Sequence, residues 1–465
     1  MKIRTAAVTL TMIGATALVL SSCSAGGSDS DGGDSGDGIT FWVQEDLPDR
    51  VAATEEIVAA FTEESGIPVE VVSVAEDQFA QLITSSAAAG DLPDVIGGIS
   101  LPQVRTLSAN ELVDADAVGA VIDSLDASTF SDKALELTAD GDAQLAVPSE
   151  SWLQMLFYRT DLFEAAGLDA PDTYEKVLEA AEALNSPELA GFVGATAPGD
   201  AFTEQTFEQV ALGNDCQLVN ADGEIELDSA ACVEAFGFYG DLISNYSVPG
   251  AQDVDTTRAT YFAGEAAMFI WSSFVLDEMA GLREDAKPNC PECADNPAFL
   301  AENTGVVTSI AGPDGTEPAQ FGEITSWTIT EGANVEDSQA FVEYMMSTGY
   351  EDWIAIAPEG KVPVRFGTAD EPALYSDAWA TFPAGVDTKA PLSDFYAPEV
   401  LEQVAAGPEN IARWAIPQGQ GDLLGALQGE QPVATAVSEV TQGTDAEQAA
   451  AIAAEAARSV QESLQ

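Results

Sequence analysis

The feature that most constrains the fold is the segment YFAGEAAMFIWSSF at residues 261–274. Gly264 is the residue type that ends a helix in the left-handed conformation, and residues 266–271 form a short apolar run typical of a strand buried on both faces. The two serines that follow can cap a second helix. This order predicts an open α/β sheet, with Trp271 at the carboxyl end of a strand, where such sheets bind ligands.

Strands and helices also alternate through the first part of the chain. Short β-branched or apolar runs are separated by longer segments with helical spacing of apolar residues. This alternation predicts βαβ units and a mostly parallel sheet. The expected elements are strands at residues 39–43, 69–74 and 95–96 and helices at residues 50–65 and 79–89.

The chain is long and strongly acidic. Its 465 residues exceed what a single hydrophobic core organises and therefore predict two lobes. With 15 basic and 79 acidic residues, its net charge of −64 repels nucleic acid and anionic membrane surfaces. Histidine is absent, which excludes Ser-His-Asp and Cys-His catalysis and metal sites built from histidine. Among so many carboxylates, close pairs arise by chance and do not by themselves indicate a glycosidase.

The N-terminus predicts secretion and a lipid anchor. Two basic residues followed by an apolar segment make residues 1–22 a secretory signal, and the segment is too short for a transmembrane helix. The sequence Leu-Ser-Ser-Cys that ends at Cys23 resembles a bacterial lipobox, in which the cysteine is lipidated. The Ser, Gly and Asp residues that follow make residues 23–38 a flexible tether. We therefore expect a protein held on the outer face of the cell membrane.

Three segments of the chain match the motifs of a known family in its own order. Residues 90–96 follow the pattern G-D-x-P-D-V-x, and residues 146–184 follow P-x(n)-L-x-Y-N-K-D-L-F-x-x-A-G-L-x-x-P-x-T-W-x-E-L, with Arg159 in place of the asparagine. Residues 261–274 follow F-x-x-G-K-A-A-M…G-x-W, with Glu265 in place of the lysine. The chain thus resembles the extracellular solute-binding proteins of ABC importers, in the maltose- and oligosaccharide-binding class.

The resemblance implies an α/β, two-lobed periplasmic-binding-protein-like fold with hinge crossovers between the lobes. The first crossover is expected at residues 144–148 and 154–158, and the chain is expected to return near residue 305. The implied division is a signal at residues 1–22, a tether at residues 23–38, an N-terminal lobe at residues 39–148 and 305–360, and a C-terminal lobe at residues 149–304 and 361–465.

Candidate ligand-binding residues are aromatic or polar side chains near predicted strand ends. Aromatic rings pack against the C–H face of a pyranose, while carboxylates and amides bind its hydroxyls. Spacing alone leaves open whether each tryptophan faces the cleft or packs in the core, and a structural ion pair is the other role open to Arg365. The full set is Trp42, Gln44, Glu45, Asp94, Ser100, Trp152, Trp271, Trp327, Arg365 and Trp414.

Four cysteines beyond Cys23 predict two disulfides, because thiols outside the cytosol oxidise. Of the three possible pairings we favour Cys216 with Cys232, which flank a turn-rich segment, and Cys290 with Cys293, which lie in a polar loop. A redox role for the C-x-x-C is disfavoured because no strand leads into it. A four-cysteine zinc site is disfavoured because a second C-x-x-C is missing.

The resemblance implies a non-enzymatic binding protein that captures an extracellular carbohydrate by hinge closure and delivers it to the permease of an ABC transporter. Its expected partners are the solute, the permease subunits and, through the lipid on Cys23, the membrane. We expect a monomer without a cofactor. Two alternatives stay open. The same fold can bind a polyamine or another small solute, which an acidic cleft favours. A surface glycoside hydrolase would need a carboxyl of raised pKa facing another across the sugar.

Overall fold

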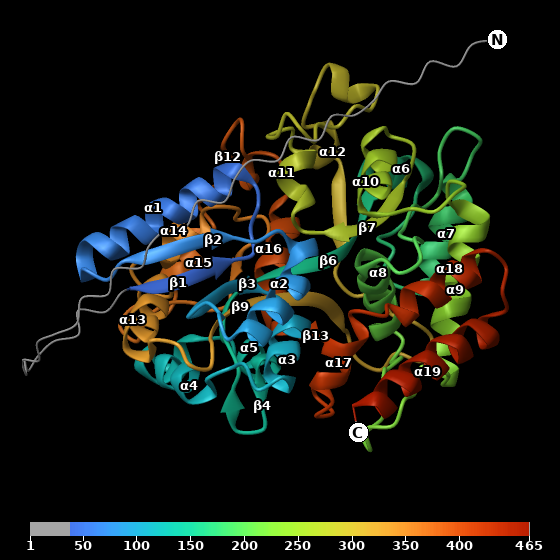
Figure 1. Ribbon diagram of the computed structural model, residues 1–465. Coiled ribbons are helices and arrows are strands. Elements are labelled where there is room, and N and C mark those ends of the chain that lie inside the picture. Colours follow the sequence, from blue (N-terminus) through green and yellow to red (C-terminus); the bar gives the residue numbers. More distant parts are fainter. Residues whose placement is uncertain (1–37, 465) are drawn as a thin grey trace, which may run out of the picture. The chain divides into compact units, whose positions relative to one another are not determined.

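A computed structural model describes residues 38–464 of the chain (Figure 1). The predicted signal at residues 1–22, Cys23 and nearly all of the tether lie outside the described residues. No helix in the described part is both long and apolar enough to cross a lipid bilayer.

The described residues are organised around one sheet, which runs through the middle of Figure 1. Its main path has the order β10-β6-β9-β3-β1-β2, and β7, β8 and β13 pair beside it. The strands are β1 (Ile39–Val43), β2 (Val69–Ser73), β3 (Val95–Ile99), β6 (Val147–Arg159), β7 (Met268–Ser272), β8 (Thr304–Val307), β9 (Gln320–Ile329), β10 (Val362–Pro363) and β13 (Ile411–Ala412). Two short hairpins complete the strands, formed by β4 (Ala139–Asp140) with β5 (Ala143–Gln144) and by β11 (Pro383–Ala384) with β12 (Ala390–Pro391).

The long strand β6 joins the two halves of this sheet. Its first part pairs antiparallel with β9 from Val147 to Leu153, and its second part pairs antiparallel with β7 and β8 from Gln154 to Arg159. The sequence predicted a crossover at this place but divided it into two pieces. The structure corrects that division, because one strand of 13 residues runs without interruption through both halves.

The sheet is more antiparallel than the sequence predicted. The βαβ units expected at the N-terminus are present, since β1 pairs parallel with both β2 and β3. The pairs β3–β9, β6–β9, β6–β7 and β6–β8 are all antiparallel. The expectation of a mostly parallel sheet is therefore wrong beyond β1 to β3, where the short pair of β9 with β13 is parallel but the long pairs are not. The reason is that β6 and β9 are long crossover strands that run alongside each other in opposite directions.

Most predicted helices are present with boundaries close to those expected. Helix α1 (Pro48–Ser65) ends at Gly66, which has the left-handed φ of 79°. Helix α7 (Tyr174–Leu184) begins after Thr173, whose hydroxyl accepts a hydrogen bond from the backbone N–H of Lys176 at 3.2 Å. The predicted serine cap before Phe274 is wrong. Ser273 is fully buried and bonds to the backbone of Leu153, and the helix that follows, α11 (Val275–Met279), has no side-chain cap.

The helices cover both halves of the sheet (Figure 1). In Figure 1, α1, α13 and α4 lie beside the half that holds β1 to β3, and α7, α9, α18 and α19 lie beside the half that holds β7. Their bounds are α1 (Pro48–Ser65), α2 (Glu76–Ala89), α3 (Leu101–Ala109), α4 (Ala115–Ser124), α5 (Asp132–Thr138), α6 (Thr160–Ala166), α7 (Tyr174–Leu184), α8 (Ala201–Leu212), α9 (Ala230–Tyr246), α10 (Val254–Phe262), α11 (Val275–Met279), α12 (Phe299–Glu302), α13 (Val335–Met345), α14 (Tyr350–Ile354), α15 (Leu374–Trp379), α16 (Pro398–Ala406), α17 (Gly421–Leu427), α18 (Pro432–Thr441) and α19 (Ala446–Ser463).

Each half has its own hydrophobic core. Phe41, Trp327 and Phe341 pack together at the centre of the core beside β1 and β9. A larger core lies against β6, β7 and helices α8 and α9. Two disulfides cross-link this second half, Cys216 with Cys232 and Cys290 with Cys293. Both pairings favoured from the sequence are therefore confirmed.

Candidate binding site

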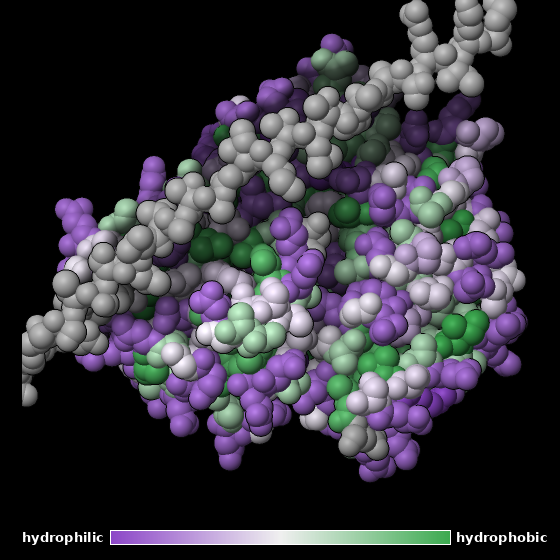
Figure 2. Space-filling model, in the orientation of Figure 1, coloured by the Kyte–Doolittle hydropathy of each residue, from purple (hydrophilic) through white to green (hydrophobic). Residues whose placement is uncertain are grey.

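A cavity of about 740 Å³ lies where elements of both halves meet. One side is formed by the loop between β1 and α1, the start of α3, and the segment from α14 to β10. The other side is formed by α8, the starts of α10 and α17, and the segment after β7. The crossover strands β6 and β9 contribute the residues between these two sides. On the face shown in Figure 2 the surface is largely hydrophilic, with apolar residues in small patches.

Four of the residues predicted from the sequence line this cavity. Gln44 and Glu45 follow β1, and Ser100 is the N-terminal cap of α3, so all three lie at carboxyl ends of strands in the first half. Trp152 lies on β6 and is partly buried, with its ring centroid 5.9 Å from that of Phe321. The structure therefore brings these four side chains together around one space.

Two predicted tryptophans of the first half lie in its hydrophobic cores instead. Trp327 has no exposed surface, because its ring stacks on Phe41 at 4.9 Å and meets Trp353 edge to face at 5.1 Å. Trp42 is buried among apolar residues that include Phe79 and lies outside the cavity lining. Side chains along a strand point alternately to its two faces. The face that carries Trp327 and the face that carries Trp42 each pack against apolar residues of a core.

Two further predicted residues, Trp414 and Arg365, also lie away from the cavity lining. Trp414 is buried, and its indole N–H donates to the carbonyl of Cys216 at 2.8 Å. The guanidinium of Arg365 is buried and donates to Thr129 Oγ1 at 3.1 Å and to the carbonyls of Leu125 and Met346, so hydrogen bonds take the place of the expected ion pair. Their placement corrects the expectation that these side chains face the cleft.

Asp94 lies at the wrong end of its strand for the cavity. It precedes β3, whereas the cavity lies at the carboxyl ends of β1 and β3. Its two carboxylate oxygens accept the backbone N–H groups of Thr40 and Asn334, each at 2.8 Å. Asp94 is therefore a structural link between the sheet and the start of α13.

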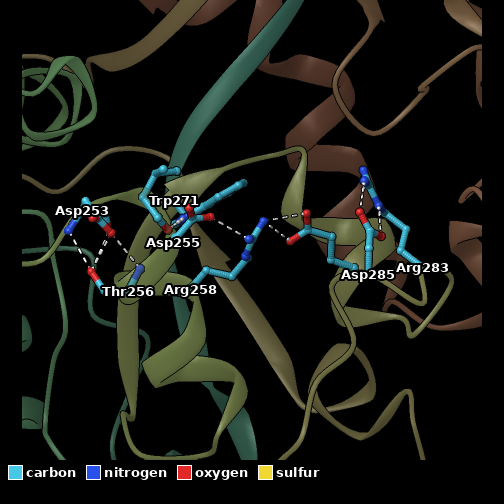
Figure 3. Close-up of polar contacts among 9 residues, drawn as sticks. Asp253, Asp255, Thr256, Arg258, Trp271, Arg283 and Asp285 are labelled. Carbon is cyan, nitrogen blue, oxygen red and sulfur yellow. Dashed lines mark hydrogen bonds and ion pairs between the residues drawn. The ribbon is translucent and has the colours of Figure 1, made fainter. Parts of the chain in front are cut away.

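Trp271 lies directly behind the cavity wall. Its indole N–H donates to the carbonyl of Val254 at 3.1 Å, and its ring centroid is 6.0 Å from that of Phe202. Figure 3 shows Trp271 beside Arg258, whose guanidinium carbon is 5.6 Å from the indole ring and which also bonds to Asp255 and Glu278. Because Val254 and Phe202 line the cavity, Trp271 supports its wall without lining it.

On one side of the cavity the acidic side chains are neutralised by cations. We call this set of Glu45, Arg50, Glu150 and Lys361 the paired wall. Arg50 lies 3.6 Å from Glu45 and also 3.5 Å from Glu359 outside the cavity. Lys361 donates to Glu150 at 2.8 Å, and the second oxygen of Glu150 accepts the indole N–H of Trp353 at 2.8 Å. The charges of this wall are thus balanced within the protein.

Between the two sides lies a buried ion-pair chain formed by Glu208, Arg413 and Glu323, which we call the arginine floor. Arg413 donates to Glu208 at 3.3 Å and to Glu323 at 2.7 Å, and all three side chains are almost fully buried. Glu323 also accepts the backbone N–H of Leu101 at 2.7 Å. The floor therefore connects α8 in one half with the first turn of α3 in the other.

The opposite side of the cavity is acidic and unbalanced. Asp200, Glu204 and Glu208 occupy successive turns of α8 and its N-terminal cap, and all three line the cavity; we call them the α8 face. Asp200 and Glu204 make no ion pair within the described residues. Burial and the neighbouring charge of Glu208 raise the pKa of Glu204 to about 8, and burial also raises the pKa of Asp200.

Aromatic surface reaches the cavity from both halves. Besides Trp152, the rings of Phe202, Phe274 and Trp353 line it. Phe274 lies so close to Gly360 that a Cβ at that position would be 1.9 Å from its ring, which requires glycine there. The sequence analysis missed these rings. Phe202 and Trp353 lie in helices, and helical spacing does not show which apolar residues face the cavity and which face the core.

A family model described as bacterial extracellular solute-binding protein matches residues 44–391 of the chain. The chain is 30% identical over 325 residues to the putative ABC transporter periplasmic-binding protein YcjN of Escherichia coli K12, with coverage of 68% of this chain and 70% of that protein.

Solved structures are similar to this fold at low identity. The GacH receptor of Streptomyces glaucescens, determined unliganded and in complex with acarbose, superposes with a TM-score of 0.68 at 18% identity, covering 91% of this chain and 98% of that one. A sugar transporter protein from Arthrobacter chlorophenolicus A6 with bound laminaribiose gives a TM-score of 0.66 at 21% identity, covering 91% and 99%. Both similarities establish a two-lobed periplasmic-binding-protein fold for this chain.

Proposed function

The chain belongs to the bacterial extracellular solute-binding protein family, and from this premise we propose that it captures a carbohydrate outside the cell for import. It is the solute-binding protein of an ABC transporter. The family is one of transport proteins rather than enzymes. The identity of the solute and the way it is bound are the proposal.

The observation that carries this proposal is the chemistry of the cavity. It combines four aromatic rings, from Trp152, Phe202, Phe274 and Trp353, with carboxylates and amides in a space of about 740 Å³. A pyranose presents C–H faces that pack on aromatic rings and hydroxyls that donate to carboxylates and amide oxygens. Related structures hold acarbose and laminaribiose, which supports a sugar as the solute here.

We propose that binding closes the two lobes around the solute. Strands β6 and β9 pass through both halves, and the cavity is lined by residues from both. A rotation about such crossovers changes the separation of the cavity walls without unfolding either core. The closed form then presents a surface to the permease subunits that the open form does not. We propose that the two lobes that move are those predicted from the sequence, residues 39–148 with 305–360 and residues 149–304 with 361–465.

We also propose that the mature protein is attached to the outer face of the membrane by a lipid on Cys23. The lipobox-like sequence before this cysteine supports the attachment. The Ser/Gly/Asp segment that follows provides a tether long enough for the binding lobes to meet the permease.

The arrangement of acids favours binding over hydrolysis. A glycosidase places two carboxyl groups on opposite sides of the scissile bond. In this cavity the acids with raised pKa, Asp200, Glu204 and Glu208, all lie on the α8 face, and the carboxylates across from them, Glu45 and Glu150, are paired with Arg50 and Lys361. Glu208 is also held by Arg413, so it is not free to act as a base.

A panel of ligands tests the proposal. Melting temperature is measured with neutral mono- and oligosaccharides, and the recovered ligand is analysed for cleavage. We expect at least one carbohydrate to raise the melting temperature in proportion to the logarithm of its concentration above Kd and to be recovered intact. Released product would show an enzyme, and the absence of any stabilising carbohydrate would contradict a sugar-binding function.

A further inference from the structure

The charges around the cavity do not balance within the protein. Seven acidic and three basic side chains line it, and each base is already paired with acids. Arg50 and Lys361 serve the paired wall, and Arg413 serves the arginine floor. Asp46, Asp200 and Glu204 are left without a cation among residues 38–464, and of these Asp46 is exposed to solvent. The acids inside the cavity that lack a cation are therefore on the α8 face.

The acids of the α8 face lie along one side of the helix. Asp200, Glu204 and Glu208 are four residues apart, so their carboxyl groups lie along one side of the helix, and the charge of Glu208 favours the protonated form of Glu204. Oδ2 of Asp200 and Oε2 of Glu204 are buried and have no hydrogen-bond partner in the described part of the chain. Burying such an oxygen without a hydrogen-bond partner destabilises the folded protein, so these atoms are expected to bind a donor.

A second side chain points to a missing partner at the same place. Gln154 on β6 is fully buried and lines the cavity. Its Nε2 donates to Thr206 Oγ1 on α8 at 3.1 Å, which fixes the amide beside the helix, while its Oε1 has no hydrogen-bond partner among the described residues. Three unpartnered acceptor atoms thus line one side of the cavity, and together they require donors from outside the protein.

We propose that the carbohydrate taken by this cavity carries a protonated amine, which Asp200 and Glu204 bind as an ion pair with Gln154 as a further acceptor. This inference rests on the proposed sugar-binding function and names the class of sugar. An ammonium group has three donors and no acceptor, so it matches three unpartnered acceptors, and it supplies the positive charge that the α8 face lacks.

A neutral sugar fits the α8 face less well. A hydroxyl can donate one hydrogen bond to a carboxyl oxygen, which leaves the other unpartnered acceptors on this side of the cavity without donors and supplies no positive charge. A metal ion is not the expected cation, because no cluster of three or more metal-ligating side chains occurs in the described residues. The apolar rings of Trp152 and Phe202 favour an organic ligand with both a C–H face and a charged group.

If an ammonium group binds Glu204, that carboxyl releases its proton, and the affinity then depends on pH. Glu204 faces Asp200 and Glu208 on its own helix and Arg413 from the segment after β13, and burial together with Glu208 keeps it protonated near neutral pH. Binding of an ammonium group favours the ionised carboxylate, so the proton must leave. Affinity for an amino sugar should therefore rise by up to about tenfold per pH unit between pH 6 and 7, whereas affinity for a neutral sugar should not.

Matched sugar pairs test the proposal on the wild-type protein. Glucose is compared with glucosamine and N-acetylglucosamine, galactose with galactosamine and N-acetylgalactosamine, and putrescine and spermidine are included as amines without a sugar. Calorimetric Kd values are expected to be at least about tenfold lower for an amino sugar than for its neutral and N-acetylated partners, as a charge-assisted hydrogen bond predicts.

Three variants locate the effect. Glu204→Gln and Asp200→Asn keep the side-chain shape and remove the charge, and each is expected to reduce the amine preference and its pH dependence. Asp241→Asn, on the exposed surface of α9, is the control and should retain both. Because these substitutions keep the side-chain shape and break no ion pair of the described residues, folding is not expected to suffer, and melting curves verify it.

The outcomes separate the inference from the function on which it rests. Neutral sugars that bind as tightly as amino sugars would overturn the amine subsite and leave carbohydrate binding intact. Polyamine binding without any sugar binding would overturn the carbohydrate proposal while supporting an ammonium site on α8. An amine preference unchanged in Glu204→Gln and Asp200→Asn would place the amine elsewhere and overturn the assignment. Binding of none of these ligands would overturn both.

Discussion

The acidic residues on the two sides of the cavity differ in whether the protein itself provides their partners. On the paired wall, Glu45 and Glu150 are each within 4 Å of a cation of the protein, and Glu150 has both oxygens bonded. On the α8 face, Asp200 and Glu204 each have a buried oxygen without a partner in the described structure. Acids that are satisfied internally shape the cavity, whereas unsatisfied ones are available to a ligand. Acidic composition alone therefore does not identify a binding surface.

The arginine floor shows how the difference arises. Arg413 reaches Glu208 and Glu323 but no other acid within ion-pair distance in the described residues. One turn earlier on α8, Glu204 lies close enough to experience its charge but is not bonded to it. A single buried cation thus divides the acids of one helix into a structural member and two members open to a ligand.

The largest expected effect comes from removing the cation of the floor. Arg413→Met leaves Glu208 and Glu323 buried without a counter-charge, and breaking a buried pair in this way costs about 3–5 kcal/mol of unfolding free energy. Chemical denaturation of the variant and the wild type measures it. The matched control is Arg458→Met, which breaks a half-exposed pair with Asp228 and should cost about 0–1 kcal/mol.

Equal losses for these two arginine variants would contradict the structural role given to the floor. Adding Glu208→Gln and Glu323→Gln to Arg413→Met should restore much of the lost stability, because no uncompensated charge then stays buried. This recovery distinguishes a charge effect from a loss of packing.

Trp152 tests the apolar surface that both sides of the cavity share. Trp152→Ala removes a ring that lines the cavity, and affinity for the bound sugar should fall roughly tenfold, as expected for one aromatic contact. Isothermal calorimetry provides the Kd. Trp271→Phe is the comparison, because it keeps an aromatic ring behind the wall and should change affinity much less. A larger loss in Trp271→Phe would mean that the ligand contacts a different surface.

The unpaired acid on α8 predicts a pH dependence of stability. The pKa of Glu204 is raised from 4.5 to about 8, so the folded protein retains a proton that the unfolded chain has already lost. Stability from this group is therefore fully present below pH 4.5 and is lost as the pH rises through about 8. In Glu204→Gln, the melting temperature should decline less between pH 5 and 8 than in the wild type. Parallel pH profiles would contradict the buried, unpaired state of this carboxyl.

The smallest effect is expected from an acid at the exposed edge of the cavity. Asp46→Asn removes a charge that also lacks an ion-pair partner in the described residues but lies in water, where it is screened. Kd for the amino sugar should change by less than about twofold, compared with a much larger change in Glu204→Gln. Equal effects would show that net charge, rather than burial on α8, selects the ligand.

The fold was largely predictable because its signals are local. Glycine stops and helical spacing identified α1 and α2, because the expected helices at residues 50–65 and 79–89 lie within Pro48–Ser65 and Glu76–Ala89. The long crossover strand was divided in the prediction because Ser149, Glu150 and Ser151 interrupt its apolar pattern. Those residues are buried polar groups, which the sequence gives no means to distinguish from a loop.

The site was less predictable because it depends on pairings between distant residues. Of the five candidate tryptophans, only Trp152 lines the cavity, since strands covered on both faces show no alternation that separates core from cleft. One signal was present in the sequence, because Asp200, Glu204 and Glu208 have the spacing of a single helix face. The distinction between Glu204 and Glu208 depends on Arg413, which lies 205 positions away from Glu208 in the chain.

The most direct test of the account is a crystal structure of the protein with the sugar that raises its melting temperature most. We expect a single intact sugar in the cavity between the paired wall and the α8 face, with a ring face against Trp152 and a donor group at Asp200 and Glu204. A sugar bound at another surface while this cavity stays vacant, or one turned with no group toward α8, would contradict it.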